Sequence, residues 1–195
     1  MCIIIYKPKG EDLPDYRDLQ HCWNVNPDGA GIMFADGNYL RIAKGFMTWI
    51  EFEEMLCELV RHFDIKSMPL AIHFRYATHS AVSPACCHPF TLKDDYIPMR
   101  QIRQSSSIAF MHNGKLEGLY TDDVTSDSMA FARNVLTPLM SLCDDFLNDD
   151  RAKSIIEATA QGSRFLIMDK TGEVRLYGEW YEDNGIYYSN ANYGA

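Results

Sequence analysis

The sequence lacks a cluster of basic residues, a long apolar run and a paired cysteine motif. Its 195 residues carry 18 Lys and Arg against 27 Asp and Glu, which gives a formal net charge of −9. The nearest approach to a basic cluster, residues 100–103, holds only two arginines. Nucleic acids and anionic membrane surfaces are bound through clustered positive charge, so the sequence disfavours both kinds of partner.

No stretch reaches the ~18 uninterrupted apolar residues of a membrane span, and no basic-then-apolar leader precedes Cys2. We therefore expect a cytoplasmic protein. The length and the hydrophobic content of 47% are ordinary for a globular chain. We expect residues 1–195 to form a single domain.

Six cysteines are present, but none belongs to a C-x-x-C pair and their spacing gives no disulfide framework. Reduced thiols in a reducing compartment are the simpler interpretation. The run Cys86-Cys87-His88, with His73 and His79 upstream, resembles a set of metal ligands. Zinc sites usually have a second, separated ligand pair, which this chain lacks, so we expect no metal and no other cofactor.

Hydrophobic periodicity predicts a series of hairpins interrupted by helices. Thr48 and Glu51 form a capping box that begins a helix, and further helices are expected from Ser126-Asp127 and over about 150–160. Pro138 predicts either a kink or a new helix capped by Thr137. The strands are expected over residues 2–7, 30–35, 39–42, 70–75, 108–111, 164–168, 174–177, around 181, and 186–189.

Two connections are predicted without regular structure. Residues 11–22 are polar and irregular, and residues 81–106 resemble a long functional flap. Hairpins dominate and a clean βαβ alternation is absent, which indicates an α+β fold of antiparallel sheets layered with helices.

Met1-Cys2 precedes an apolar strand and predicts a nucleophile. Cysteine is small enough for the initiator methionine to be removed, which leaves a thiol and an α-amine on one residue. An α-amine has a pKa of about 7.7–8.0, so about a third is neutral near pH 7.5 and can accept the thiol proton. The competing interpretation is an accidental Met-Cys start.

Polar groups also follow two of the predicted strands. Arg75-Tyr76-Ala77-Thr78-His79 stands where a strand opens into a loop, a common place for catalytic groups. As structural residues, Arg75 would be a surface charge and His79 a capped loop histidine. Asn113-Gly114 places a side-chain amide beside an unhindered backbone N–H, as an oxyanion site requires, although Asn-Gly is also a common tight turn.

Together these pieces resemble the class II glutamine amidotransferases, whose glutaminase domain is an N-terminal-nucleophile (Ntn) hydrolase. The most specific pieces are Arg-x-Ala-Thr-His and His-Asn-Gly. The resemblance covers most of the chain and includes Met1-Cys2, Asp28-Gly29-Ala30-Gly31, Arg75 to His79, Cys87-His88-Pro89, His112-Asn113-Gly114, Ser126-Asp127-Ser128, and Ile186 to Asn190.

The resemblance implies a four-layer αββα sandwich, with two antiparallel sheets between helical layers. It also implies that Cys2 attacks the side-chain amide of glutamine and forms a γ-glutamyl thioester, with its own α-amine relaying the proton. The oxyanion would be held by Asn113 and by the N–H of Gly114. Water would then release glutamate.

The same resemblance implies the substrate contacts. Arg75 would bind the α-carboxylate, helped by Thr78 and His79 and flanked by Tyr76, and Asp127 would bind the α-ammonium. Four residues depart from the family pattern and leave the substrate open: Ile3, Tyr76, Ser80 and Met129. None of these four is a catalytic group.

An amidotransferase passes ammonia to a synthase. The glutaminase-like features run from Cys2 to Asn190, so we expect a separate synthetase or ligase to supply the acceptor. Two other functions stay open: an Ntn amidase acting on another amide, and a non-catalytic regulatory or binding scaffold. An N-acyl substrate offers no ammonium for Asp127, which argues against the amidase. The retained catalytic residues argue against the scaffold.

Overall fold

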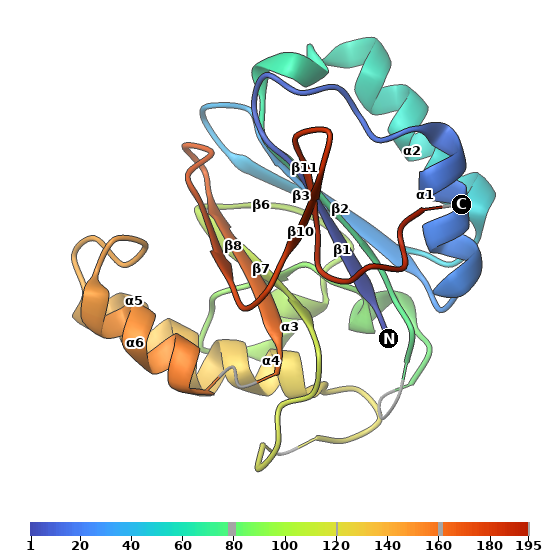
Figure 1. The fold of residues 1–195 in the computed structure, drawn as a ribbon. Coiled ribbons are helices and arrows are strands. Elements are labelled where there is room, and N and C mark those ends of the chain that lie inside the picture. Colours follow the sequence, from blue (N-terminus) through green and yellow to red (C-terminus); the bar gives the residue numbers. More distant parts are fainter. Residues whose placement is uncertain (78–80, 120, 160–161, 195) are drawn as a thin grey trace.

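The computed structural model describes residues 1–77, 81–119, 121–159 and 162–194, and the structural statements that follow refer to these residues. Two antiparallel sheets are stacked between two layers of helices (Figure 1). This arrangement confirms the predicted αββα sandwich.

The larger sheet has seven strands in the order β10-β11-β1-β4-β2-β3-β6, and the smaller has four in the order β5-β7-β8-β9. Every described strand pair is antiparallel. The strands are β1 Ile3–Lys7, β2 Ala30–Ala35, β3 Leu40–Phe46, β4 Leu70–Phe74, β5 Phe90–Thr91, β6 Arg103–Ser106, β7 Ile108–Asn113, β8 Arg164–Asp169, β9 Val174–Tyr177, β10 Tyr181–Asp183 and β11 Ile186–Tyr188.

The helices cover the two outer faces. The larger sheet is covered by α1 (Tyr16–Val25) and α2 (Trp49–His62). The smaller sheet is covered by α4 (Asp127–Phe131), a π-helical turn (Ala132–Leu136), α5 (Thr137–Leu142) and α6 (Asp150–Thr159). Connections contain α3 (Tyr96–Arg100) and two 3₁₀ turns, Ile65–Ser67 and Pro84–Cys86.

Three hydrophobic cores separate the four layers. One lies between α1, α2 and the larger sheet, a second between the smaller sheet and its helices, and a third between the two sheets. In β1, for example, Ile3 and Ile5 belong to the first core while Ile4 belongs to the core between the sheets. This alternation follows from the period of two along a strand.

The same alternation determines which residues meet between the sheets. Ala109 and Met111 of β7 lie in the inner core, so Asn113 continues on that face. Ile3 pairs with Phe74, and the residues just beyond this pair are Cys2 and Arg75. The strand pattern thus brings the ends of β1, β4 and β7 to one edge of the sandwich.

Most of the predicted elements are confirmed, including the hairpin of β2 and β3 and the capping box at Thr48. Thr48 accepts a hydrogen bond from the N–H of Glu51, and the Glu51 carboxylate accepts one from the N–H of Thr48. At Pro138 the helical path continues, through the π-helical turn that precedes α5. Pro138 therefore lies in the first turn of α5, as one alternative predicted, but Thr137 does not cap that helix, because the preceding Leu136 is itself helical.

The prediction that residues 11–22 are irregular was wrong, because α1 begins at Tyr16. The Asp15 side chain accepts a hydrogen bond from the N–H of Arg17, and Leu19, Cys22 and Trp23 share the buried face of the helix. Three apolar residues at this spacing are sufficient for a short helix that packs on a sheet.

The description of residues 81–106 as a loop was also incomplete. This segment contains β5, α3 and β6, and it contributes a strand to each sheet. Its elements are two to five residues long, which is too short for a clear periodic signal.

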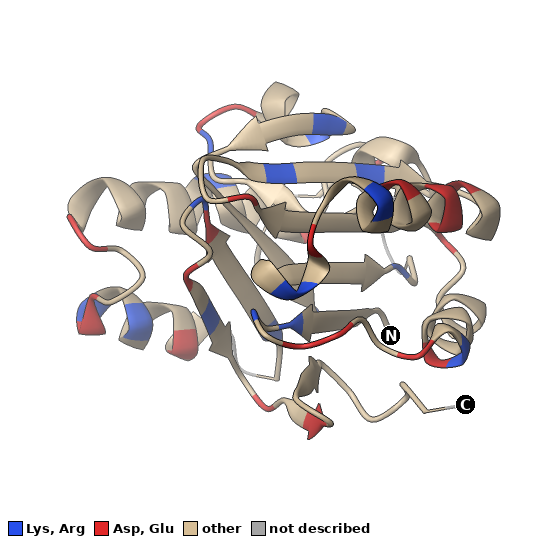
Figure 2. Ribbon diagram, turned by 90° about the horizontal axis from the view of Figure 1, so that it is seen from above, with Lys and Arg blue, Asp and Glu red and all other residues tan. Residues whose placement is uncertain are grey.

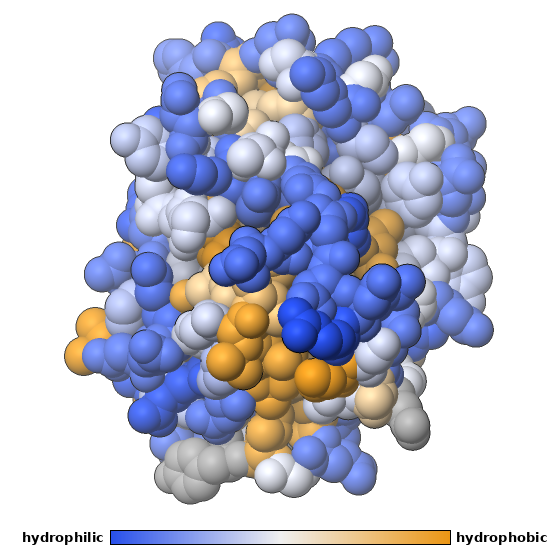
Figure 3. Space-filling model, turned by 90° about the vertical axis from the view of Figure 1, so that its left-hand side faces the viewer, coloured by the Kyte–Doolittle hydropathy of each residue, from blue (hydrophilic) through white to orange (hydrophobic). Residues whose placement is uncertain are grey.

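Charged residues of both signs are spread over the ribbon, with acidic residues prominent on the helices (Figure 2). The side of the molecule at the left of Figure 1 carries a patch of apolar side chains within a largely hydrophilic surface (Figure 3). Among the described residues, no helix is long and apolar enough to cross a membrane.

Candidate active site

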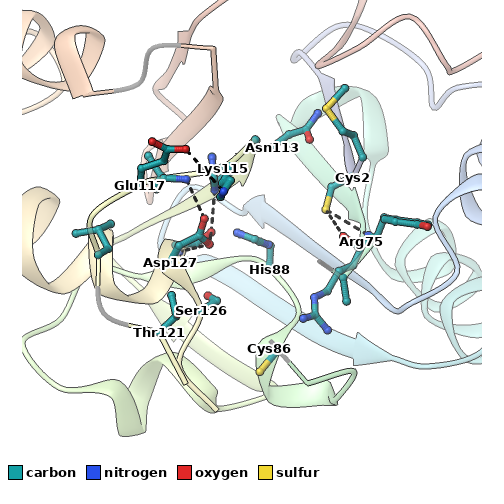
Figure 4. A pocket seen from close by; sticks show the side chains of 18 of the residues that line it. Cys2, Arg75, Cys86, His88, Asn113, Lys115, Glu117, Thr121, Ser126 and Asp127 are labelled. Atoms are coloured by element: carbon teal, nitrogen blue, oxygen red, sulfur yellow. Dashed lines mark hydrogen bonds and ion pairs between the residues drawn. The ribbon is translucent and has the colours of Figure 1, made fainter. Parts of the chain in front are cut away.

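A cavity of about 430 Å³ opens where the ends of β1, β4 and β7 approach the first turn of α4. Figure 4 shows Cys2 and Arg75 on one side of it, Asp127 on the opposite side and His88 between them. The lining includes Met1, Cys2, Arg75, Tyr76, Ala77, Cys86, His88, His112, Asn113, Gly114, residues 115–119, Thr121, Ser126, Asp127 and Ser128.

The Cys2 thiol is held by the backbone of the loop that follows β4. Its sulfur lies 3.2 Å from the nitrogen of Tyr76, which donates to it, and 3.4 Å from the oxygen of Tyr76, to which the thiol donates. Burial raises the pKa of the Cys2 thiol, while the Tyr76 N–H, the Arg75 guanidinium and the terminal ammonium act in the opposite direction. Deprotonation of this sulfur therefore needs a nearby base.

Hydrogen bonds to Asp28 hold the backbone at Arg75 and at Ala77, and so fix the point from which the Arg75 side chain extends. Asp28 donates its N–H to the oxygen of Arg75 at 3.0 Å, and the Asp28 carboxylate accepts from the N–H of Ala77 at 2.8 Å. Arg75 is 4% exposed, and its Nη1 donates to the oxygen of Ala81 at 2.9 Å. A buried guanidinium favours an anionic ligand because it is poorly solvated.

Asn113 and Gly114 stand at the end of β7. Gly114 has a φ of +148°, and a Cβ at this position would lie 2.3 Å from the Oγ of Ser163, so a side chain is excluded. The Asn113 side chain is buried, and its Nδ2 donates to the Oγ of Ser189 at 2.9 Å. Its Oδ1 is also buried and has no hydrogen-bond partner among the described residues.

Asp127 lies in the first turn of α4, opposite the thiol. Its Oδ2 accepts from the N–H of Leu116 at 3.0 Å, and its Oδ1 accepts from the N–H of Ser128 at 2.7 Å. These bonds hold the carboxylate at the cavity wall (Figure 4). A fixed anion here and a fixed cation at Arg75 suit a ligand that carries an ammonium and a carboxylate.

Three buried histidines lie at the cavity: His88 and His112 line it, and His73 packs behind His88. The rings of His73 and His88 are in contact, with centroids 4.2 Å apart and planes tilted by 32°, and burial holds the pKa of His88 well below its ordinary value. Burial also lowers the pKa of His73 to about 3 and that of His112 to about 4. All three are therefore neutral near pH 7. His112 shares hydrogen bonds with Ser128 and Ser163, which connects Asp127 to the Gly114 turn.

The cavity brings together six of the residues predicted from the sequence: Cys2, Arg75, Tyr76, Asn113, Gly114 and Asp127. The predicted Thr78 and His79 lie outside the described residues. Tyr76 contributes its backbone to the thiol, and its residue is 47% exposed. No group of His, Cys, Asp and Glu suited to a metal ion occurs within the described ranges.

Sequence reasoning gave no role to several residues that hold this site. Ser163 limits the Gly114 turn, and Asn190 donates from Nδ2 to the oxygen of Cys2 at 2.7 Å. Ser189 contacts both Asn113 and the backbone of Ile4. Ser189 ends a predicted strand, and both Ser189 and Asn190 belong to the segment that resembles the family, but that resemblance gave neither residue a role.

Comparison with known proteins matches this chain to a protein family by sequence and to a solved structure by fold. The family description "Glutamine amidotransferases class-II" matches residues 13–131, a range that contains Arg75, Asn113, Gly114 and Asp127 and begins after Cys2. A search of curated protein sequences finds no match.

Among solved structures, the chain is similar to a glutamine phosphoribosylpyrophosphate amidotransferase from B. subtilis, complexed with ADP and GMP. The TM-score is 0.51 at 18% sequence identity. The similarity covers 96% of this chain and 41% of that one, so the present chain spans less than half of that protein. At this identity the likeness concerns the fold.

Proposed function

The chain belongs to the class II glutamine amidotransferases, and from this premise we propose that its cavity hydrolyses the side-chain amide of glutamine with Cys2 as the nucleophile. The observation that supports the proposal most directly is that Cys2, Arg75, Asn113, Gly114 and Asp127 line one cavity. The five residues come from four separate parts of the chain, and each supplies a group that this reaction needs.

The reaction would begin after removal of Met1, which converts the nitrogen of Cys2 into a free α-amine. This amine takes the thiol proton as the sulfur attacks the amide carbon of glutamine. The amide carbonyl becomes an oxyanion. The amine then returns the proton to the leaving nitrogen, so that ammonia departs and a γ-glutamyl thioester remains. Water activated by the same amine releases glutamate.

The other residues would stabilise charge. The N–H of Gly114 and the side-chain amide of Asn113 would donate to the oxyanion, a contribution of about 10²–10³ in turnover per donor. The Arg75 fork would bind the α-carboxylate and Asp127 the α-ammonium. Thr78 and His79 are proposed as further carboxylate contacts on the basis of sequence resemblance alone.

We further propose that residues 1–195 act as one glutaminase domain and that a separate synthetase or ligase accepts the ammonia. The single glutaminase domain is supported by the proposed site, which uses residues from Cys2 to Asp127, and by the strands that hold it, which extend to β11. The ammonia acceptor is proposed from membership of the amidotransferase family. Affinity purification of the native protein tests this. We expect a synthetase or ligase to co-purify, and strong uncoupled glutaminase activity of the isolated chain would count against it.

The central experiment treats the mature protein with a diazoketone analogue of glutamine and maps the adduct by mass spectrometry. We expect the chain to begin at Cys2 and to carry one adduct on that sulfur. Cys57, which is exposed, is the internal control for non-specific alkylation. Equal labelling of Cys2 and Cys57, or protection of neither by added glutamine, would contradict the proposed function.

A further inference from the structure

Ser189 connects the nucleophile strand with the residue proposed to hold the oxyanion. It follows β11 and is fully buried. Its Oγ accepts from the N–H of Ile4 at 2.8 Å, and its own N–H donates to the oxygen of Ile4 at 2.9 Å. The same Oγ lies 2.9 Å from Nδ2 of Asn113, across the space between the two sheets.

In the pair Ser189 and Asn113, one donor and one acceptor are left without a hydrogen-bond partner among the described residues. The Ser189 oxygen accepts two N–H groups, so its own hydroxyl proton is left over. The Oδ1 of Asn113 is buried without a donor among the described residues. A hydroxyl carries one donor and two acceptor sites, and a carboxamide oxygen needs a donor when it is buried.

Rotating the Asn113 side-chain amide by 180° gives a hydrogen-bond partner to both the Ser189 hydroxyl and the Asn113 Oδ1. The amide oxygen and nitrogen have nearly the same size, so the turn exchanges them with little movement of their neighbours. Oδ1 would then accept the Ser189 hydroxyl proton, while Ser189 still accepts from Ile4. Nδ2 would take the place that Oδ1 now holds, so both its protons would be free for another acceptor. An amide oxygen at that place would repel an oxyanion, whereas an N–H donates to it.

We propose that Ser189 is the positioning residue that sets the orientation of the Asn113 amide. By donating to Oδ1 it keeps Nδ2 available to the oxyanion. By accepting from Ile4 it also fixes the distance between that donor and the strand that carries Cys2. This inference rests on the proposed function, because it assigns a task to Ser189 in the same reaction.

Asn190 extends the same connection. Its Nδ2 donates to the oxygen of Cys2 at 2.7 Å. The side chain of Asn190 therefore holds the nucleophile residue Cys2, and the side chain of the adjacent Ser189 holds the oxyanion donor Asn113. A small error in either position changes the alignment of the attacking sulfur with the stabilising N–H, and such errors lower turnover more than binding.

The test compares the glutaminase kinetics of the mature protein with those of Ser189→Ala and Ser189→Cys. We expect each variant to lower kcat about tenfold or more while KM changes by less than about twofold. Cysteine preserves the shape of serine but is a weak donor, so it should fail to restore kcat. Recovery of wild-type kcat in Ser189→Cys would show that Ser189 only fills space, and would overturn the proposal.

A double-mutant cycle separates orientation from general damage. In an Asn113→Ala background, Ser189→Ala should change kcat by less than about twofold, because the group that it orients is already gone. An equal loss of kcat in both backgrounds overturns the proposal. Ser106→Ala is the matched control, since Ser106 donates to the oxygen of Ile108 at 2.8 Å on β6, outside the cavity. Its kcat should match the wild type.

The side-chain amide resonance of Asn113 gives a readout that does not depend on turnover. Its ¹⁵N–¹H pair is identified by its loss in Asn113→Ala, and we expect Ser189→Ala to move it while Ser106→Ala does not. If the wild-type protein releases no ammonia from glutamine, the proposed function fails, and this resonance alone decides the positioning role. An unmoved resonance in Ser189→Ala overturns that role.

Discussion

Two buried cations support the cavity and its surroundings, and they have different partners. Arg75 reaches the cavity, whereas Lys44 of β3 is 2% exposed and donates to the oxygens of Ala85 at 3.2 Å and Met99 at 2.6 Å. Lys44 also lies 4.1 Å from the ring centre of Phe90. These Lys44 contacts are with neutral groups, which compensate a buried charge only weakly. Arg75 instead faces the cavity that is proposed to receive the substrate carboxylate. We therefore expect substitution of Arg75 to affect catalysis and substitution of Lys44 to affect stability.

Replacing Arg75 with alanine should weaken the use of glutamine. The loss in kcat/KM should correspond to about 2–5 kcal/mol, because the substrate carboxylate would be left without its partner in a buried place. Steady-state kinetics with glutamine measure the effect, and Arg41→Ala is the control, since Arg41 pairs with Asp36 on the surface. A loss below about tenfold would assign the carboxylate contact to another residue.

Lys44 should make the free energy of unfolding depend on pH. Burial lowers the pKa of its ammonium in the folded protein to about 7, from an ordinary value of 10.5. Between these values the unfolded chain binds the extra proton, so stability rises with pH from about 7 to about 10.5. Each unit of separation corresponds to about 1.36 kcal/mol at most.

The measurement is the denaturation midpoint at about pH 7 and about pH 9.5, compared between the wild type and Lys44→Met. Titrating thiols also contribute in this range, because burial raises the pKa of Cys22 to about 12 and that of Cys87 to about 11. Both proteins share the Cys22 contribution, whereas Cys87 interacts with Lys44, so the comparison is made in a Cys87→Ala background. The wild type should gain more stability on raising the pH than the variant, and equal changes in the two would contradict a lowered pKa for Lys44 in the folded protein.

At the scale of elements, alternation along the strands explains why so much of the site was predictable. Ile4, Ala109 and Met111 point between the sheets, and the same parity carries Cys2 and Asn113 to the cavity. Pairings between distant segments were beyond such reasoning. Ser189 meets Asn113 only because β11 pairs with β1, and no local pattern specifies which strands become neighbours.

The errors in the predicted elements have a related cause. The α1 helix has a mostly polar sequence and is stabilised by packing of three residues on the larger sheet. Residues 81–106 were assigned to a loop because β5 and β6 are short and depend on partners elsewhere in the chain. Tertiary contacts override weak local preferences in both cases.

Gly31 of β2 shows how one element holds another in place. A Cβ at this position would lie 1.9 Å from the backbone oxygen of His88 and 2.7 Å from the Cβ of Lys44. We expect Gly31→Ala to lower the free energy of unfolding by about 1–3 kcal/mol, because the His88 segment must move away from β2. Since His88 lines the cavity, KM for glutamine should rise as well.

Chemical denaturation and steady-state kinetics measure these two effects. Gly194→Ala is the control, because a Cβ there meets no atom within 4 Å. Unchanged stability in Gly31→Ala would show that the His88 segment is not packed against β2.

At the scale of the molecule, the cavity depends on both sheets at once. Cys2 and Arg75 come from the ends of strands in the larger sheet, while Asn113 ends a strand of the smaller sheet and Asp127 begins a helix that covers it. Their relative positions are maintained by the core between the sheets. The site can therefore form only if the two halves fold as one body, which is the arrangement expected of a single domain.

Cooperative unfolding tests this expectation. Trp23 and Trp49 lie in or against the core of the larger sheet and Trp180 packs against the core between the sheets, so tryptophan fluorescence reports on these two regions. Phe131 is fully buried in the core of the smaller sheet, and Phe131→Ala should lower the free energy of unfolding by about 3–5 kcal/mol. In a single cooperative unit, Phe131→Ala must lower the fluorescence midpoint by as much as the circular dichroism midpoint, although the tryptophans lie outside the core that contains Phe131. A fluorescence transition that stays in place while the dichroism transition moves would show two independently folding halves.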